Sequence, residues 1–488
     1  MTTPPPTFEA PPEPTTSQFK TPPPSSKGLT PPGLKHSLPF YAFKPWVKLG
    51  SPILLFEYLL KTYGNIAWYR FMGTPIVFIN DPEYIREILV TQAANFVKER
   101  TVRRMKVLLG EGLITSDDPI HMRQRKIAAP AFHRQRIAAY GDQIVACAAH
   151  QRDSWQKESS SGQQIDISAA SMKLSLEIVA RTLFNTEVTA DIRSINDEVN
   201  TIMDLYNFIV AFPKIESFIH LPIPGIMRFR RSKARLDAVV DRIIHEHREA
   251  AARGEPDRGD LLSMLLASKY ESDDATQQTG MSDEQVRDEV LTIFLAGYET
   301  VANGLAWTWY LLSQNPDIED KLHTELNTVL GTGTNQRLPT LADYPALRYT
   351  EQIFAESMRL YPPAWAMGRM STKPVTLGPY TIPAGAHFFF SQYIMGRDPQ
   401  YFPDPLRFDP DRFTPENKAI RAKFTYFPFG GGSRQCIGES FAWMEGVFSI
   451  ATLAQRWRMT YLGSAPPEVQ AKITLRPRNP LMMQLIPR

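Results

Sequence analysis

The pattern of apolar and polar positions separates a short region of strand character from a long helical region. Apolar runs at residues 65–71 and 75–79 flank Gly73 and predict a β-hairpin. Apolar residues at helical spacing predict helices at residues 82–91, 139–158, 168–183, 231–252 and 261–266. Strand-like runs return at residues 373–376, 380–382 and 387–390, and the last 30 residues are expected to form another hairpin.

The longest predicted helix begins at Ser282, which forms a capping-box pattern with Gln285. No proline or strong helix breaker follows until Pro316, so the helix would have roughly 33 residues and span about 50 Å. Its middle is almost entirely apolar, which predicts burial on most sides. Two further helices are predicted, at residues 346–360 and 438–454. The balance of elements indicates a mainly helical α+β fold with a small, separate strand region.

Proline is concentrated at the N-terminus, where the first 40 residues hold 12 of the 41 prolines. Residues 1–37 are rich in Pro, Thr and Ser and have almost nothing to bury, so they cannot offset the entropy of ordering. The sequence predicts a disordered extended tail there, with a docking site for a polyproline-binding module as the alternative. The rest of the chain, residues 38–488, is long enough to bury a large core.

Composition and charge exclude several classes of protein. Two cysteines cannot form a disulfide framework or a four-cysteine zinc or iron–sulfur site. A net charge of +3 is too small to indicate binding to nucleic acid. No apolar run approaches the roughly 18 residues of a membrane span, and no secretory signal is visible. We therefore expect no membrane span, no nucleic-acid partner and a reducing compartment.

A glycine-rich stretch from Phe429 to Gly438 presents a single cysteine, Cys436. Its glycines form a tight loop and let backbone N–H groups approach the sulfur. A thiolate binds metal, and one cysteine can serve as the axial ligand of haem iron. A structural cysteine and a phosphate-binding loop are the alternatives, although the spacing of phosphate and dinucleotide loops is absent. The other cysteine, Cys147, is expected to be a small buried apolar side chain.

Four motifs resemble those of the cytochrome P450 family, the haem-thiolate monooxygenases, and they occur along the chain in the family's order. The cysteine signature F-x-x-G-x-R-x-C-x-G is matched by Phe429, Gly432, Arg434, Cys436 and Gly438. The family's E-x-x-R and P-x-x-F-x-P-x-R-F patterns are matched by Glu356, Arg359, Pro405, Phe408, Pro410, Arg412 and Phe413. The pattern A-G-x-[D/E]-T of the long helix is matched by Ala296, Gly297, Glu299 and Thr300. The resemblance covers residues 38–488 and implies one catalytic domain of the cytochrome P450 fold, with haem between a large helical part and a smaller β-rich region.

The resemblance implies haem b (iron protoporphyrin IX) as cofactor and assigns residues to it. Cys436 would be the axial ligand of the iron, with Phe429 and Gly438 shaping the loop around it. The propionates need cationic partners, and the implied ones are Arg434, Arg125, His121 and Arg369. Glu356, Arg359 and Arg412 would form a buried charged triad that supports the scaffold.

In the family the acid–alcohol pair of the long helix delivers protons for oxygen activation, which assigns catalytic roles to Thr300 and Glu299. The small residues Ala296 and Gly297 would leave room for O2 beside the iron. The resemblance further implies a lipophilic substrate pocket, lined by Leu113, Ile114, Phe208, Phe212, Phe294, Ala364, Met367, Leu481 and Met482. Plain core packing is the alternative for each of these apolar residues.

The sequence contains no flavin, nicotinamide or ferredoxin motif, so electrons are expected from a separate ferredoxin or flavodoxin with an NAD(P)H-linked reductase. Residues 98–136 carry ten Lys or Arg against four Asp or Glu. This basic cluster would dock an acidic electron-transfer protein or simply be solvated. His245 and His247 lie two positions apart on a polar helix and are expected at the surface. The resemblance to soluble bacterial members implies a cytoplasmic monomer.

The implied reaction is insertion of one oxygen atom of O2 into an organic substrate, with the other atom leaving as water. Two other functions remain open at this point. A hydrogen-peroxide-driven peroxygenase would not need Glu299 and Thr300. A non-enzymatic haem-binding protein would need neither Thr300 nor a lipophilic pocket.

Overall fold

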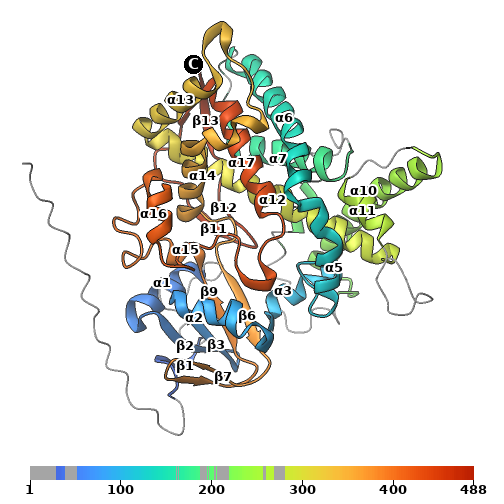
Figure 1. Cartoon of the computed structure of the whole chain (residues 1–488). Helices are drawn as coiled ribbons and strands as arrows, with labels where there is room; N and C mark the ends of the chain where they lie inside the picture. The colour runs from blue at the N-terminus through green and yellow to red at the C-terminus, as the bar shows by residue number, and fades with distance from the viewer. Residues whose placement is uncertain are drawn as a thin grey trace, which may run out of the picture.

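A six-stranded sheet lies at one end of the protein and the helices lie above it, with α12 crossing the centre (Figure 1). This computed structural model describes residues 29–38, 52–160, 162, 164–186, 195, 197–199, 201, 202, 205, 219–255, 260–268 and 281–488. The described helices are α1 (Pro52–Tyr63), α2 (Pro82–Arg86), α3 (Arg100–Arg104), α4 (Lys106–Leu109), α5 (Ile120–Ala128), α6 (Arg134–Ser160), α7 (Ile167–Leu183), α10 (Pro224–Ala252), α11 (Leu261–Ala267), α12 (Asp283–Gln314), α13 (Pro316–Leu330), α14 (Arg348–Leu360), α15 (Gln392–Met395), α16 (Pro415–Ile420) and α17 (Glu439–Ala454).

The strands form one large sheet and three small ones. They are β1 (Gly33–Ser37), β2 (Ile66–Phe71), β3 (Thr74–Ile79), β4 (Phe96–Lys98), β5 (Gln164–Asp166), β6 (Met367–Ser371), β7 (Val375–Leu377), β8 (Tyr380–Ile382), β9 (His387–Phe390), β10 (Trp457–Tyr461), β11 (Val469–Ala471), β12 (Leu475–Pro477) and β13 (Met482–Pro487). The large sheet has the order β1-β2-β3-β9-β6-β4. The smaller sheets are β10-β13-β5, the hairpin β11-β12 and the hairpin β7-β8. The mainly helical fold with a separate strand region is therefore as predicted.

The long helix α12 organises the helical part. Ser282 caps it with a complete capping box, in which Gln285 N–H donates to the Ser282 side chain and the Gln285 side chain accepts from the Ser282 backbone. The apolar middle packs against α7 on one side and approaches α14, α17 and β10 on others. Trp307 and Trp309 are among its fully buried side chains. This all-round burial explains why its sequence has no single polar face.

Several predicted boundaries differ from the structure. The predicted helix at residues 82–91 is α-helical only to Arg86 and then widens into a π-helical segment, η2 (Glu87–Thr91), where Gln92 N–H donates to Glu87 O at 2.7 Å. The hairpin predicted in the last 30 residues is present as β11–β12, but the final strand β13 pairs outside it, with β10 and β5. His247 is buried rather than exposed, because its Nε2 lies 2.9 Å from Asp260, which caps α11.

The C-terminal boundary predicted for the disordered tail, at residue 37, is too late, because residues between 29 and 37 pair with the sheets. Leu29 forms a bridge with Tyr380, and Gly33–Ser37 forms β1 in parallel pairing with β2. Trp68 N–H donates to Pro32 O at 2.7 Å, so this segment gains backbone hydrogen bonds despite its prolines. Residues 1–28 of the predicted tail lie outside the described residues. Among the helices that the structure describes, none has both the length and the apolarity needed to cross a membrane.

Candidate active site

The cysteine loop, Phe429 to Gly438, leads into α17 and is tied together by its own backbone. Cys436 N–H donates to Phe429 O at 2.9 Å, and Gly430 N–H donates to Phe427 O at 2.9 Å. Gly432 has φ +72°, and a Cβ atom there would lie 1.9 Å from Leu89 O. A side chain at this position would therefore clash with the η2 backbone, so the loop needs glycine to reach its position.

Cys436 is exposed, whereas Cys147 is fully buried in α6. Desolvation by the surrounding protein raises the pKa of the Cys436 thiol, and the Gly438 N–H group and Arg125 act in the opposite direction. Arg125 Nη1 donates to Gln435 O at 2.7 Å, which ties α5 to the loop. The Phe429 ring lies 5.7 Å from the Trp443 ring of α17. The loop thus carries one exposed cysteine beside an aromatic pair.

Basic side chains from four segments gather near this loop: Lys98, Arg369, Arg434 and the imidazole of His121. Burial, and then the Arg434 charge, lower the pKa of Lys98 to about 7. Burial and then Arg434 lower the pKa of Arg369 to about 10. Burial followed by the charges of Lys98 and Arg434 lowers the pKa of His121 to about 4. The nearby carboxylates Asp117 and Asp118 offset only part of this positive charge.

This cluster fits the anionic edge of a porphyrin. The buried atoms His121 Nδ1 and Arg434 Nε have no hydrogen-bond partner in the part of the chain that the structure describes. A cavity of about 190 Å³ is lined in part by Leu89, Asp118, Arg369 and Arg434. Unpartnered buried N–H groups next to excess positive charge are satisfied by carboxylates, and haem carries two of them as propionates. The donor set therefore suits a haem bound through Cys436.

The middle of α12 carries the predicted acid–alcohol pair. Ala296, Gly297 and Thr300 keep partial exposure within an otherwise buried stretch. The Thr300 hydroxyl donates to Ala296 O, one turn earlier, at 2.8 Å. Ala296 and Thr300 are four residues apart and therefore lie on the same side of the helix. This side is the accessible one.

Glu299 is only 3 % exposed and is held by the C-terminal hairpin. Thr474 Oγ1 donates to Glu299 Oε1 at 2.6 Å, and Arg476 Nη2 lies 3.5 Å from the same oxygen. Asn303, one turn later on α12, donates from Nδ2 to Glu299 O at 2.9 Å and to Thr474 Oγ1 at 3.3 Å. Burial raises the pKa of Glu299, and Arg476 and Thr474 oppose that rise.

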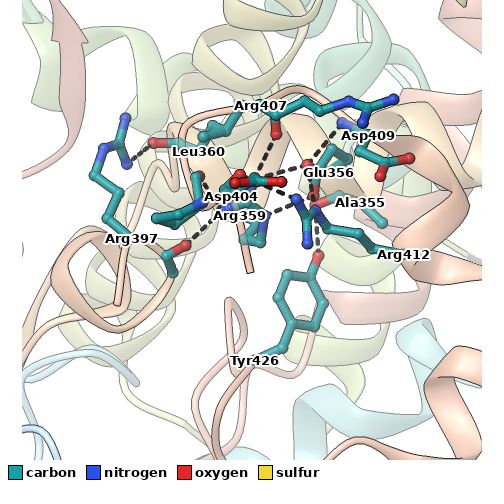
Figure 2. Close-up of polar contacts among 12 residues, drawn as sticks. Ala355, Glu356, Arg359, Leu360, Arg397, Asp404, Arg407, Asp409, Arg412 and Tyr426 are labelled. Carbon is teal, nitrogen blue, oxygen red and sulfur yellow. Dashed lines mark hydrogen bonds and ion pairs between the residues drawn. The ribbon is translucent and has the colours of Figure 1, made fainter. Parts of the chain in front are cut away.

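Glu356, Arg359 and Arg412 meet in one network of polar contacts (Figure 2). Arg359 donates from Nε and Nη2 to the two oxygens of Glu356 at 2.6 and 2.7 Å, and both side chains have zero exposure. Arg412 Nε lies 3.5 Å from Glu356 Oε1. The remaining donors of Arg359 serve the backbone oxygens of Gly396, Pro405 and Arg407. The guanidinium thereby joins α14 to two loops far along the chain.

The predicted pocket residues fall into different places. Leu113 is buried, and its backbone is fixed on both sides, because its N–H donates to Glu289 at 3.1 Å and its oxygen accepts from Lys98 at 2.7 Å. Ile114 is partly buried against the same core. Met367 begins β6 and lies against Gly430 of the cysteine loop. Ala364 precedes β6 and is partly exposed.

Three of the predicted pocket residues pack against other elements, and two lie outside the described residues. The Phe294 ring packs 5.8 Å from Phe184 and 6.0 Å from Tyr298. Because two residues turn a helix by about 200°, Phe294 faces away from the Ala296 side. Leu481 is 1 % exposed and its N–H donates to Asp166, so it and the adjacent Met482 belong to the β13–β5 packing. Phe208 and Phe212 lie outside the described residues.

Sequence reasoning missed three residues that the structure brings to the site. Lys98 was counted only as part of the basic cluster, although its burial at the end of β4 distinguishes it from the solvated lysines. Thr474 and Arg476 reach Glu299 from the β11–β12 hairpin. No local signal in the sequence could have found them, because their approach depends on how the hairpin packs against α12.

Comparison with known proteins identifies the family. The family model described as Cytochrome P450 matches residues 31–485. Cyclooctatin synthase of Streptomyces melanosporofaciens is 36 % identical over 400 residues, covering 82 % of this chain and 84 % of that protein. Pentalenene oxygenase of Streptomyces avermitilis is 32 % identical over 420 residues, covering 85 % of this chain and 88 % of that protein.

Solved structures show the same fold at lower identity. The crystal structure of the cytochrome P450DA heme domain has a TM-score of 0.81 at 22 % identity and covers 95 % of this chain and 98 % of its own. The family match and the two bacterial relatives agree with the cysteine loop, the cation cluster and the central helix described above. The chain belongs to the cytochrome P450 family, the haem-binding monooxygenases, and is an oxidoreductase of that family.

Proposed function

We propose that this protein uses a haem b bound through Cys436 to insert one oxygen atom of O2 into a lipophilic substrate, with electrons from a separate protein. The observation that carries the proposal is the exposed Cys436 sulfur on its glycine loop, with the buried cation cluster beside it. Haem bound through a thiolate supplies the activation of O2. The chain's own residues hold the cofactor, exclude water and manage protons.

The residues divide into holding and proton-handling groups. Cys436 would hold the haem iron through its sulfur. Arg434, Arg369, Arg125, His121 and Lys98 would hold the propionates, which would offset the burial and the Arg434 charge that lower the pKa values of Lys98 and Arg369. Thr300 would hold a proton-donating hydroxyl on the accessible side of α12, and Glu299 would pass protons toward it.

A terpenoid is the proposed substrate class. The relatives named cyclooctat-9-en-7-ol 5-monooxygenase and pentalenene oxygenase are 34 % and 32 % identical to this chain over most of its length. The apolar residues Leu113, Ile114, Ala364 and Met367 would supply the lining that such a substrate needs. For electrons we propose a ferredoxin or flavodoxin. It would dock on the exposed cations Arg123, Lys126, Arg134 and Arg136 of α5 and α6, which lie beside the cysteine loop through the Arg125–Gln435 contact.

Replacement of the two cysteines tests the haem-thiolate assignment. The reduced, carbon-monoxide-treated wild type is expected to show the red-shifted Soret band of thiolate ligation. Cys436→Ser is expected to lose that band, and Cys147→Ala, the control for the other cysteine, to keep it. An unchanged band in Cys436→Ser would refute the assignment.

A substrate screen tests the proposed class. Cyclic sesquiterpene and diterpene hydrocarbons would be added singly to the haem-loaded protein, and the low-to-high-spin absorbance shift recorded. Compounds that shift the spectrum are expected to gain one oxygen atom when a surrogate ferredoxin, its reductase and NADPH are supplied, as read by mass spectrometry. Shifts and products confined to fatty acids or other non-terpenoid lipids would overturn the terpenoid proposal while leaving the monooxygenase proposal standing.

A further inference from the structure

The β11–β12 hairpin is fixed between α12 and the segment that follows α14. Trp307 Nε1 of α12 donates to Leu475 O at 3.3 Å. From the other side, Leu475 N–H donates to Pro363 O at 2.9 Å, and Trp365 Nε1 donates to Lys472 O at 2.9 Å. The turn of this hairpin is therefore held at a defined position beside the middle of α12.

The hairpin reaches α12 at Glu299. The Thr474 hydroxyl and the Arg476 guanidinium both approach Glu299 Oε1, at 2.6 and 3.5 Å. All three side chains are largely buried, with 5 % exposure for the Thr474 residue and 12 % for the Arg476 side chain. A short hydrogen bond and a cation on one oxygen in a buried setting form a strong restraint on the carboxyl group.

The restraint directs the carboxyl group away from the accessible side of α12. Thr300 and Ala296 define that side, and Thr300 makes its hydrogen bond along the helix to Ala296 O. One residue turns an α-helix by about 100°, so Glu299 projects to a neighbouring side, where β12 lies. Glu299 therefore contacts the hairpin, whereas the adjacent Thr300 bonds along the helix.

We propose that Thr474 and Arg476 are positioning residues that hold the Glu299 carboxylate against β12 and stabilise its ionised form, so that proton delivery toward Thr300 depends on the β11–β12 hairpin. This inference rests on the proposed monooxygenase function. It extends that function to two residues outside the four family motifs, on a hairpin that the structure joins to the segment before Met367 through Pro363 and Trp365.

The electrostatic surroundings of Glu299 agree with the geometry. Burial raises the pKa of Glu299, whereas Arg476, the Thr474 hydrogen bond and Lys472 lower it, in that order of size. Tyr298 on α12 is a further titratable neighbour, and burial, followed by the charge of Glu299, raises its pKa. Loss of Thr474 or Arg476 removes a stabilising contact of the carboxylate and leaves its desolvation in place.

Infrared difference spectroscopy on the haem-loaded protein tests the proposal. The protonated carboxyl band of Glu299 is assigned by its loss in Glu299→Gln, and its titration midpoint is followed with pH. Thr474→Val and Arg476→Met are each expected to raise the midpoint by about one pH unit, a tenfold change in proton affinity. Thr474→Ser, which keeps the hydroxyl, is expected to restore the wild-type midpoint.

Matched controls separate this effect from general loss of packing. Thr460→Val replaces an exposed threonine of β10, and Arg478→Met replaces an arginine whose ion pair is with Glu468. Both are expected to leave the midpoint unchanged. A midpoint that stays at the wild-type value in Thr474→Val and Arg476→Met, or moves equally in the controls, overturns the proposal.

The carbon monoxide spectrum of each variant makes the two levels of failure distinguishable. If the thiolate-type Soret band is present in all variants and the Glu299 midpoint does not respond, the hairpin inference fails and the proposed function stands. If the wild type itself lacks the band, the proposed function fails, while the midpoint measurement still decides whether the hairpin controls Glu299.

Discussion

Removal of the Arg359 guanidinium tests the buried charged network of Glu356, Arg359 and Arg412. In Arg359→Met the Glu356 carboxylate would lose two hydrogen bonds of 2.6 and 2.7 Å while remaining buried. Breaking a buried ion pair from one side costs about 3–5 kcal/mol, because the remaining charge stays desolvated. The backbone oxygens of Gly396, Pro405 and Arg407 would lose a donor as well, each at about 1–3 kcal/mol if it stays dry.

The sum, about 5 kcal/mol or more, is comparable to the whole stability of an ordinary domain. Urea unfolding of the haem-loaded protein, followed by circular dichroism and by Soret absorbance, would measure the change. Arg359→Lys keeps a positive charge but loses the paired Nε and Nη2 donors that serve both Glu356 oxygens. Its unfolding midpoint is therefore expected between those of wild type and Arg359→Met.

A control exists on the same helix. Arg348 is exposed at the start of α14 and donates only to Pro345 O among the bonds described for it, at 3.2 Å. Arg348→Met is expected to change the free energy of unfolding by no more than about 0.5 kcal/mol. If Arg359→Met unfolds at the same urea concentration as Arg348→Met, the reasoning about the buried pair is wrong.

Three further predictions concern proton handling, pH and haem retention. Thr300→Ala is expected to raise the hydrogen peroxide released per NADPH consumed. The control Thr308→Ala removes an equivalent bond to Gly304 O on the same helix and should leave this ratio unchanged. An equal ratio of hydrogen peroxide to NADPH in the two variants would contradict the role of Thr300. Burial raises the pKa of Glu289 to about 8, so the folded protein keeps a proton there that the unfolded chain releases above pH 4.5. The free energy of unfolding should therefore fall as the pH rises from 4.5 to about 8. Glu289→Gln should remove that slope in urea unfolding, and an unchanged slope would show that Glu289 is not its source. Arg369→Met should speed haem transfer to apomyoglobin several-fold, and the exposed Lys373→Met should not; identical rates would argue against the propionate role.

The parts of the fold that the sequence predicted well carry local signals. The capping box at Ser282 and the absence of proline up to Pro316 set both ends of α12 to within two residues. Glu356 and Arg359 are one helical turn apart, so their contact follows from their spacing. Helix caps and contacts between residues one turn apart can be predicted from a single segment of the sequence.

The missed features depend on contacts between distant segments. Thr474 meets Glu299 across 175 positions, and only the packing of the β11–β12 hairpin against Trp307 decides which hairpin residue faces α12. The family resemblance implied Phe294 as a pocket residue, whereas the helix turns its side chain away from the Ala296 side. Apolar character does not distinguish a core side chain from one that lines a pocket.

The pairing of β1 bears on how the protein can be shortened for study. A version that begins at residue 38 would delete β1 and the Pro32 oxygen that accepts from Trp68, which leaves the β2 backbone as an unprotected sheet edge. Such edges recruit strands from other molecules, so that version is expected to self-associate at high concentration. A version that begins at or before Leu29 would keep the edge covered and also retain the bridge to Tyr380.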